Sequence, residues 1–555
     1  MKKYKKRMAS ILLTLVIVMT MFFAAPMTVF AANTNYYIGG ADNSSGTWYA
    51  DLDTLIDDVT LADGDTITLL GNVGPGSETL SIPNINVTLN LGIYALTIDA
   101  TVPNDTGISV YNGYLAINGT GTLNVTGGAT YQGISITDNS KVTVNGATVN
   151  AAGGIGVQVG SAGSVGELTL SAGAINATSS TNIAVVAQNN SKVTISNATV
   201  TGTGRNGVYA ESGAQVTVTG DVTSSSTATT SASAYAYNGG QIIVNGNATS
   251  TGSGSYGVQA YGSGSNITVT GSASGDGTGV YASNGGKATV GNAIGTGGDA
   301  ASGTVGAAAN GSGSLVTVIN DVTSTSYGAF AQYGGQIIVD GTISAGGVYV
   351  AIQTTYKTIT NFELVTTKAG YLTYTDGTST VWVEGAAPVI DHFGTWLGSG
   401  TAFGEVDYVP DTDFYLLALD GDEVASTNYT ITPGSTVITL SEAYLGTLPN
   451  GSYTFTAFFY NVLPDNVLPQ TVRFALLDLI VSNPDAPDPG DPDTPDPDDP
   501  DIPGTPDPNN PGAGGGANGT PQTSDTNNPL LWAIMLIFSA LGIVGFVTWR
   551  KIQRA

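Results

Sequence analysis

The chain of 555 residues contains no cysteine and only one histidine, His392. Without thiols it can form neither disulfides nor the cysteine-based metal sites and thiolate nucleophiles of many enzymes. A single imidazole also excludes the H-E-x-x-H zinc site, which requires two histidines. His392 lies between Asp391 and Phe393, where we expect a packed or solvated side chain instead of a ligand. We therefore expect no cofactor and no metal ion.

Charged residues are scarce as well, at 10% of the chain, against about a quarter in an average protein. Most of them are acidic, which gives a formal net charge of -27. A chain of this sign repels the phosphate backbone, so we exclude nucleic acid as a partner. The polar positions are filled instead by Thr, Ser and Asn, next to 76 glycines. This composition favours strands and turns over helices.

The N-terminus has the three parts of a secretory signal peptide. Residues 1–10 carry five cations, residues 11–25 are apolar, and Val29 and Ala31 place small residues at a cleavage site. We predict a signal peptide over residues 1–31. The alternative is an uncleaved membrane anchor, for which the apolar run is short, since a span needs about 20 residues.

The C-terminus combines a short polar motif, an apolar run at residues 530–549 and a basic tail. The run is long enough for a transmembrane helix, and the cations after it would stay in the cytoplasm. The motif consists of Thr520, Pro521, Gln522, Thr523 and Ser524.

This order of motif, span and tail, over residues 520–555, resembles the sorting signal of sortase substrates of Gram-positive bacteria. Thr520 and Ser524 stand where that family usually has Leu and Gly. The resemblance implies that a sortase cleaves after Thr523 and joins it to peptidoglycan. The alternative is a plain C-terminal membrane anchor. In either case the body of the protein is expected outside the cell, at the cell wall or cell surface.

Residues 483–519 are dominated by Asp and Pro and then by Gly. Proline favours extended polyproline II structure, and the aspartates repel one another, so this segment is not expected to collapse into a core. We predict a linker that spans the cell wall.

Residues 107–355 are self-similar, which is the main structural signal of the sequence. Each unit reads roughly G-V-x-A, then x-V-T-V-x-G, then x-V-T-S, as in residues 207–224 and 257–274. Alternation places Val and Ile on one face of each short strand and Thr on the other. Three such strands per unit predict a right-handed parallel β-helix, an all-β solenoid. An array of β-sandwiches is the alternative, but the period is too short for it.

Residues 32–106 are predicted to form the N-terminal cap and the first strands of the solenoid. Leu52, Leu55, Ile56 and Val59 are spaced as on one face of an amphipathic helix. Such a helix would cover the backbone groups that an open end exposes.

After the repeats, residues 356–482 are richer in aromatic and acidic side chains, and short strands alternate with turns. The pattern predicts a small antiparallel β-sandwich. The segments at 420–421, 428–430, 434–440 and 444–451 resemble X2-like, immunoglobulin-like modules of clostridial surface proteins and cellulosomal scaffolds. The resemblance implies a spacer or accessory module, sometimes linked to polysaccharide or cell-wall binding, without a defined site.

Catalysis on a β-helix needs clustered carboxylates for Ca²⁺ or for acid–base chemistry. Residues 101–350 contain only 13 charged side chains, and Asp221 and Asp321, at similar positions of their units, lie several units apart. We therefore expect no catalytic residues and no enzyme.

Tyrosines in or beside the G-V-x-A strands form the candidate ligand-contact surface. Rings flanked by Asn, Ser and Thr can stack on sugars or contact proteins, or they can simply strengthen packing between strands. The surface is predicted from Tyr209, Tyr261, Tyr281 and Tyr333, and neighbouring rings are Tyr235, Tyr237, Tyr256 and Tyr327.

The sequence thus predicts a non-enzymatic, cell-wall-anchored surface protein of adhesin type, with glycans or host matrix proteins as partners. A carbohydrate-binding accessory protein is the alternative. A polysaccharide lyase or glycosidase on a β-helix is the third possibility.

Overall fold

The computed structural model describes residues 35–39, 47–102, 104–196, 200–225, 231–297, 303–407, 414–432, 435–460 and 472–484. The predicted signal peptide, the sorting signal, the apolar run 530–549 and nearly all of the linker lie outside these ranges. Within the described ranges, no helix has both the length and the apolar character needed to cross a bilayer.

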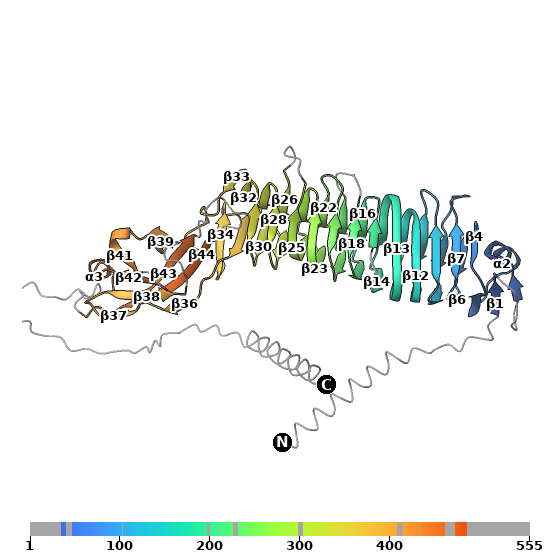
Figure 1. The fold of residues 1–555 in the computed structure, drawn as a ribbon, viewed down its shortest axis with the longest axis horizontal. Helices are drawn as coiled ribbons and strands as arrows, with labels where there is room; N and C mark the ends of the chain where they lie inside the picture. The colour runs from blue at the N-terminus through green and yellow to red at the C-terminus, as the bar shows by residue number, and fades with distance from the viewer. Residues whose placement is uncertain are drawn as a thin grey trace, which may run out of the picture. The chain divides into compact units, whose positions relative to one another are not determined.

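The repeats form a parallel β-solenoid, as predicted (Figure 1). One coil consists of β16 (Asn206–Glu211), β17 (Gln215–Thr219) and β18 (Val222–Ser224), which are the three strands expected for one sequence unit. Each strand pairs in parallel with its equivalent in the next coil, β19 (Ala232–Tyr237), β20 (Gln241–Val244) and β21 (Ala248–Ser250). We call the three resulting stacks the first, second and third stack.

The other strands continue these stacks along the solenoid. The first stack contains β5 (Leu80–Pro83), β8 (Ile108–Tyr111), β11 (Gln132–Thr137), the ends of β12 (Ser140–Val159) and β13 (Gly166–Ala187), β22 (Tyr256–Tyr261), β24 (Thr278–Ser283), β26 (Val305–Asn310), β29 (Tyr327–Gln332) and β32 (Val348–Ile352). The second contains β1 (Asn35–Ile38), β3 (Asp65–Leu69), β6 (Asn86–Gly92), β9 (Tyr114–Gly119), the starts of β12 and β13, β14 (Lys192–Ser196), the starts of β23 (Asn266–Gly275) and β25 (Lys287–Gly295), β27 (Leu315–Val318), β30 (Gln336–Val339) and β35 (Thr380–Glu384). The third contains β4 (Val73–Gly76), β7 (Ala95–Asp99), β10 (Thr122–Thr126), the middle of β12 and β13, β15 (Val200–Gly202), the ends of β23 and β25, β28 (Val322–Ser324) and β31 (Ile343–Ala345).

Apolar side chains stack on one another inside the solenoid. In the second stack, Val216 pairs with Ile242, Ile242 with Ile267, and the column continues to Ile337. Each of these four side chains is at most 1% exposed. Full burial of one such side chain contributes about 1.5–3 kcal/mol relative to exposure. The solenoid is therefore stabilised by columns of Val, Ile and Ala, without disulfides.

A buried serine fastens the corner between the first and second stacks in several coils. The hydroxyl of Ser265 accepts a hydrogen bond from Gly239 N–H at 3.0 Å and donates one to the Tyr261 carbonyl at 2.7 Å. The same acceptor role is filled by Ser140, Ser191, Ser314 and Ser379, each at most 1% exposed. These bonds satisfy backbone donors that the turn would otherwise bury without partners.

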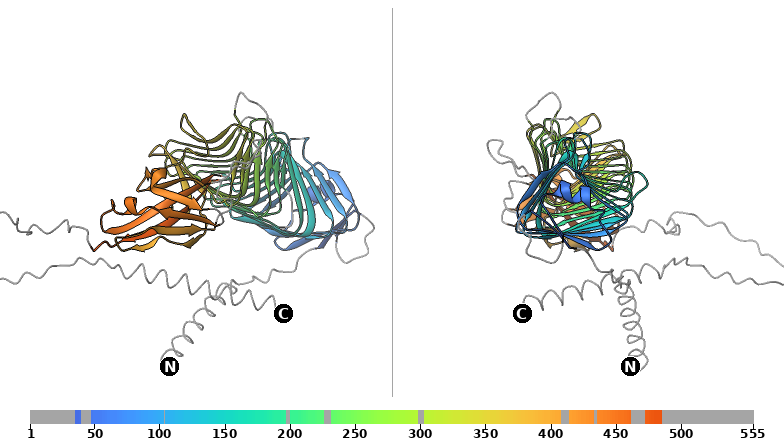
Figure 2. Two further views of the ribbon diagram at one scale, coloured as in Figure 1. Left: turned by 60° about the vertical axis from the view of Figure 1, so that its left-hand side comes forward. Right: turned by 90° about the vertical axis from the view of Figure 1, so that its right-hand side faces the viewer.

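A short helix covers the N-terminal end of the solenoid, as predicted (Figure 2, right). Helix α2 (Leu52–Asp58) buries Leu52 and Leu55 completely in the solenoid core, and Ile56 and Val59 pack against the same core. Strand β2 (Thr47–Tyr49) pairs with β1 beside it. The apolar face of the helix thus covers a core that would otherwise meet solvent.

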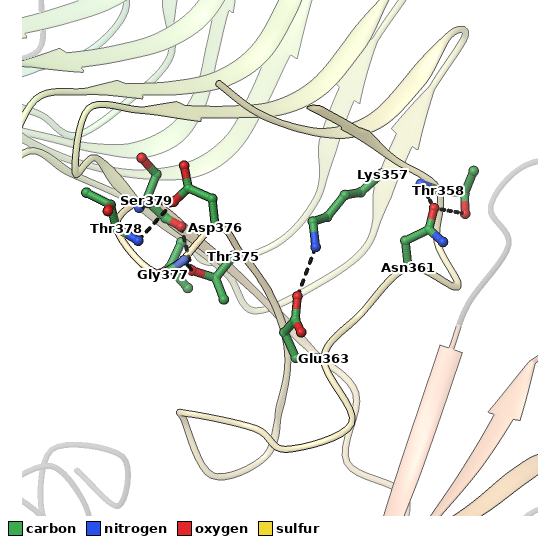
Figure 3. Close-up of polar contacts among 10 residues, drawn as sticks. Lys357, Thr358, Asn361, Glu363, Thr375, Asp376, Gly377, Thr378 and Ser379 are labelled. Carbon is green, nitrogen blue, oxygen red and sulfur yellow. Dashed lines mark hydrogen bonds and ion pairs between the residues drawn. The ribbon is translucent and has the colours of Figure 1, made fainter. Parts of the chain in front are cut away.

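The C-terminal end of the solenoid differs from the predicted boundary at residue 356. Strand β33 (Thr355–Lys357) folds back on β32, and β34 (Tyr371–Thr375) pairs with β35, which lies in parallel on β30. The turn between β34 and β35 is fixed by the Asp376 carboxylate, which accepts hydrogen bonds from the N–H groups of Thr378 and Ser379 (Figure 3). Residues up to 384 therefore complete the solenoid, because β35 buries Val381 and Val383 in its core.

The remaining segment forms two sheets around a separate core, as expected for a small sandwich. One sheet has the order β36 (Val389–Asp391), β38 (Ala402–Val406), β42 (Thr436–Leu440) and β41 (Tyr429–Thr432). The other has the order β37 (Gly394–Trp396), β44 (Val472–Val481), β43 (Gly451–Tyr460), β39 (Phe414–Leu419) and β40 (Asp422–Glu423). Among the described strands of these two sheets, all pairings are antiparallel except that of β37 with β44. The short helices η2 (Ser426–Asn428) and α3 (Glu442–Leu445) complete the segment.

The predicted Asp-Gly turn joins β39 to β40. Asp420 and Gly421 both have positive φ, at 52° and 90°, which a tight hairpin turn of this kind requires. The core between the sheets contains Trp396, Phe455 and Phe459, none more than 4% exposed. The sandwich and the solenoid belong to one compact unit.

Candidate ligand-binding face

Three of the four predicted tyrosines, Tyr209, Tyr261 and Tyr281, lie in strands of the first stack. In β16, Val208 and Ala210 are fully buried, whereas Tyr209 between them is half-buried and points outward. Register pairs Tyr209 with Tyr235. It then pairs Tyr235 with Gln259, and Gln259 with Tyr281. Tyr209 and Tyr281 therefore occupy the same column, three coils apart.

Contacts between rings connect some of the predicted residues. The rings of Tyr209 and Tyr235 meet edge to face at 5.4 Å, Tyr235 and Tyr237 lie 6.0 Å apart, and Tyr237 stacks on Tyr261 at 5.4 Å. This series joins Tyr209 to Tyr261, and we call these four residues the tyrosine row.

A second ring pair lies farther along the solenoid. Tyr281 stacks on Tyr256 at 5.3 Å with an angle of 22° between the ring planes. Because stacked rings cover one face of each other, both the pair and the row contribute to packing between coils, as the structural interpretation predicts. The rings of the row and of the pair are nevertheless only partly buried, so part of each stays accessible.

Tyr333 lies apart from these rings. It occupies the turn after β29, with φ of 52° and 65% exposure, and no ring contact is found for it among the described residues. The structure thus brings Tyr209 and Tyr261 into one row, places Tyr281 in a second pair, and separates Tyr333 from both.

A chain of polar side chains leads into the tyrosine row. Gln132 donates to Gln158 at 2.8 Å, Gln158 to Gln188 at 3.3 Å, and Gln188 donates to Glu211. Glu211 in turn accepts a hydrogen bond of 2.6 Å from the hydroxyl of Tyr209. These glutamines occupy different positions in their sequence units. The repeat pattern therefore does not single them out, and the sequence analysis missed them.

Burial and neighbouring groups keep Tyr209 and Tyr235 neutral. Burial, followed by the hydrogen bond to Glu211, raises the pKa of Tyr209 well above its ordinary value. Burial and the neighbouring Tyr237 raise the pKa of Tyr235 to about 12. Tyr209 and Tyr235 therefore offer neutral phenols to a ligand at physiological pH.

One polar atom within this face has no partner in the described part of the chain. The side-chain oxygen of Gln259, between Tyr235 and Tyr281 in the column, is buried and accepts no hydrogen bond there. An unsatisfied buried acceptor costs about 1–3 kcal/mol.

The two acidic residues that were compared in the sequence do not meet. Asp221 and Asp321 each directly precede the third-stack strand of their coil. In the coils between them, the equivalent position is occupied by Asn247, Ser272 and Asn292. Asp221 accepts from Asn247 N–H at 2.7 Å, and Asp321 accepts from Thr342 N–H at 2.8 Å. Both carboxylates cap the backbone of the following coil, which is a structural role.

Other chemistry-bearing groups do not cluster. The described residues contain no group of three or more acidic or histidine side chains placed to bind a metal ion. His392 accepts a hydrogen bond from Asp478 N–H through Nδ1 at 3.0 Å, and its side chain is 50% exposed, in line with the expected solvated residue.

No protein-family model matches the chain, and no curated protein or solved structure matches it either. The resemblances to sortase substrates and to X2-like modules therefore stay predictions from the sequence.

Proposed function

We propose that this protein is an exported bacterial surface protein of adhesin type that binds a ligand through the outer face of its first stack and does not cleave it. The observation that carries the proposal is the tyrosine row, Tyr209 to Tyr261, on a rigid parallel β-solenoid. A β-solenoid suits such a role because neighbouring coils hold side chains at fixed spacing along an extended surface.

The chemistry of the face favours glycans among the expected ligands. Neutral phenol rings provide the apolar surfaces on which sugar rings stack, and Glu211 and Gln188 beside them can bind hydroxyls. The alternative of a carbohydrate-binding accessory protein uses the same face. It differs in ligand, which would be an environmental polysaccharide instead of a host glycan or matrix protein.

A polysaccharide-cleaving enzyme remains the third proposal, and the structure gives it less support. Asp221 and Asp321 are engaged in capping separate coils, so a catalytic pair would have to be built from other residues.

The proposed attachment to the cell wall rests on the sequence motif and is testable in cells. We expect an antibody against the solenoid to label intact cells, and we expect the protein to be released by a peptidoglycan hydrolase. Thr523→Ala should shift the protein to the membrane fraction or the medium, whereas Thr526→Ala, outside the motif, should leave it in the wall. Recovery of the unchanged protein from the cytoplasm would contradict the proposal.

The proposed binding face is testable with two substitutions and a matched control. Tyr209→Ala and Tyr281→Ala should each weaken glycan or matrix binding severalfold. Tyr131→Ala serves as the control, because Tyr131 is 41% exposed and lies outside the tyrosine row.

A further inference from the structure

The end of the solenoid contains a groove that does not belong to the tyrosine row. Among the described strands, β31 is the last of the third stack and pairs only with β28, whereas the second stack continues to β35. The space beside β31 has a volume of about 500 Å³, which lies within the range of about 300–1,000 Å³ typical of small-molecule sites. Its lining includes Ile343, Val348, Tyr349, Tyr356, Lys357 and Tyr460.

An exposed ring forms one wall of this groove. Tyr356 on β33 is 62% exposed, and its ring centre lies 5.9 Å from that of Tyr327. Tyr327 in turn stacks on Phe330 at 6.2 Å, with 26° between the planes. The hydroxyls of Tyr327 and Tyr356 are 3.5 Å apart. Among the described residues, the ring of Tyr327 contacts that of Tyr356 and leaves most of the Tyr356 side chain exposed.

The groove contains one charged lining residue, and its charge is compensated. Lys357 Nζ lies 2.9 Å from Glu363 Oε1, and the lysine side chain is only 15% exposed (Figure 3). Thr358 next to it donates through its hydroxyl and its N–H to the Asn361 side chain, at 2.7 and 2.9 Å. The groove therefore offers no free cation for a carboxylate, sulfate or phosphate, and the acidic chain repels such groups further.

From these three features we propose that the groove binds a short neutral oligosaccharide, with one sugar ring stacked on Tyr356 and its hydroxyls near Thr360 and Tyr460. Apolar rings with a few polar groups and no net charge favour an uncharged, hydroxyl-rich ligand with flat apolar faces. Tyr349, which is partly buried against the solenoid core, also lines the groove. This inference does not depend on the tyrosine row or on attachment to the wall.

The test is a titration of the full chain with neutral trisaccharides: cellotriose, maltotriose, xylotriose and chitotriose. Trigalacturonic acid serves as the anionic probe. Calorimetry gives the affinity, and saturation-transfer NMR identifies the sugar protons that meet an aromatic ring. We expect at least one neutral trisaccharide to bind and the anionic one not to bind. Tyr356→Ala should lower the affinity at least tenfold, Tyr356→Phe should retain most of it, and Tyr131→Ala should retain all of it.

Any one of the following results would overturn the inference. These are no binding of any neutral trisaccharide, preferential binding of the anionic one, and equal loss of affinity in Tyr356→Ala and Tyr131→Ala. Binding of an extended peptide in place of sugars would likewise reject it. Tyr209→Ala and Tyr281→Ala should not change the affinity of this groove, so that failure of the inference and failure of the proposed binding face are distinguishable.

Discussion

Ser314 Oγ accepts a hydrogen bond of 3.0 Å from the N–H of Gly285, which belongs to the preceding coil. The same hydroxyl donates to the Asn310 carbonyl at 2.7 Å. One buried side chain thus joins two coils at a corner where the backbone turns and its polar groups cannot hydrogen-bond to one another. Because Ser265 and Ser379 make the equivalent bond to Gly239 and Gly334, the corner is a repeated structural element.

Ser314→Ala should destabilise the folded protein by about 1–3 kcal/mol, because the Gly285 N–H would be left buried without an acceptor. Urea unfolding followed by far-UV circular dichroism measures this change. The matched control is Ser312→Ala in the same turn, where the side chain is exposed and a change below about 0.5 kcal/mol is expected. Equal effects of the two substitutions would contradict the role assigned to the buried hydroxyl.

Gly240→Ala should be among the most damaging single substitutions in the solenoid. A Cβ at Gly240 would lie 2.0 Å from the Ala210 carbonyl oxygen of the preceding coil, and the next nearest atoms are also backbone, which cannot yield as a flexible side chain can. We expect a loss of about 3 kcal/mol, at the upper end for overpacking. Gly254→Ala meets no atom within 4 Å and should cost only about 1 kcal/mol through its positive φ. The midpoints of thermal unfolding distinguish these outcomes.

Tyr371 should titrate abnormally at high pH. Its hydroxyl donates to Asp340 Oδ1 at 2.6 Å, and this hydrogen bond, followed by burial, raises its pKa to about 12. The folded pKa exceeds the ordinary value of 10, so this contribution to stability is complete below pH 10 and is lost as the pH rises towards 12. Asp340→Asn should lower the pKa of Tyr371 and reduce the alkaline loss of stability. Phenolate absorbance measures the titration, and an unchanged pKa in Asp340→Asn would refute the assignment.

Asp51→Ala should loosen the N-terminal cap. The Asp51 carboxylate accepts from Thr54 N–H at 2.8 Å at the start of α2, and this bond lowers its pKa below 3.8. Removal of an N-cap costs about 1 kcal/mol. The contribution is present above pH 4 and is lost as the pH falls through the folded pKa, so the variant and the parent should converge in acid. Asp57→Ala, exposed on the same helix, is the control for hydrogen exchange in α2.

The sequence predicts the solenoid well because one physical rule repeats in every coil. The alternation of Val216, Thr217 and Val218 fixes which side chains face inward, and stacking of identical units then fixes the register. The helix that begins at Leu52 is predicted for a similar reason, because the spacing of its apolar residues matches the period of an α-helix.

The features that the sequence does not reveal depend on contacts between units that do not repeat. The groove beside β31 exists because the third stack ends earlier than the second. No pattern in the sequence of residues 343–360 indicates that difference. The boundary near residue 384 is hidden likewise, because β34 and β35 form a hairpin that resembles sandwich strands until its pairing with β30 is known. The partners of Tyr209 follow from the register, but the stacking of Tyr237 on Tyr261 depends on side-chain rotamers.

The most direct test of the proposed function incubates the purified protein with a broad panel of glycans and matrix proteins. Binding and newly formed reducing ends are measured in the same wells. We predict saturable binding to at least one member of the panel, weakened by Tyr209→Ala and without release of reducing ends. Release of reducing ends would contradict the account by showing that the chain is an enzyme, and the absence of all binding would contradict the adhesin proposal itself.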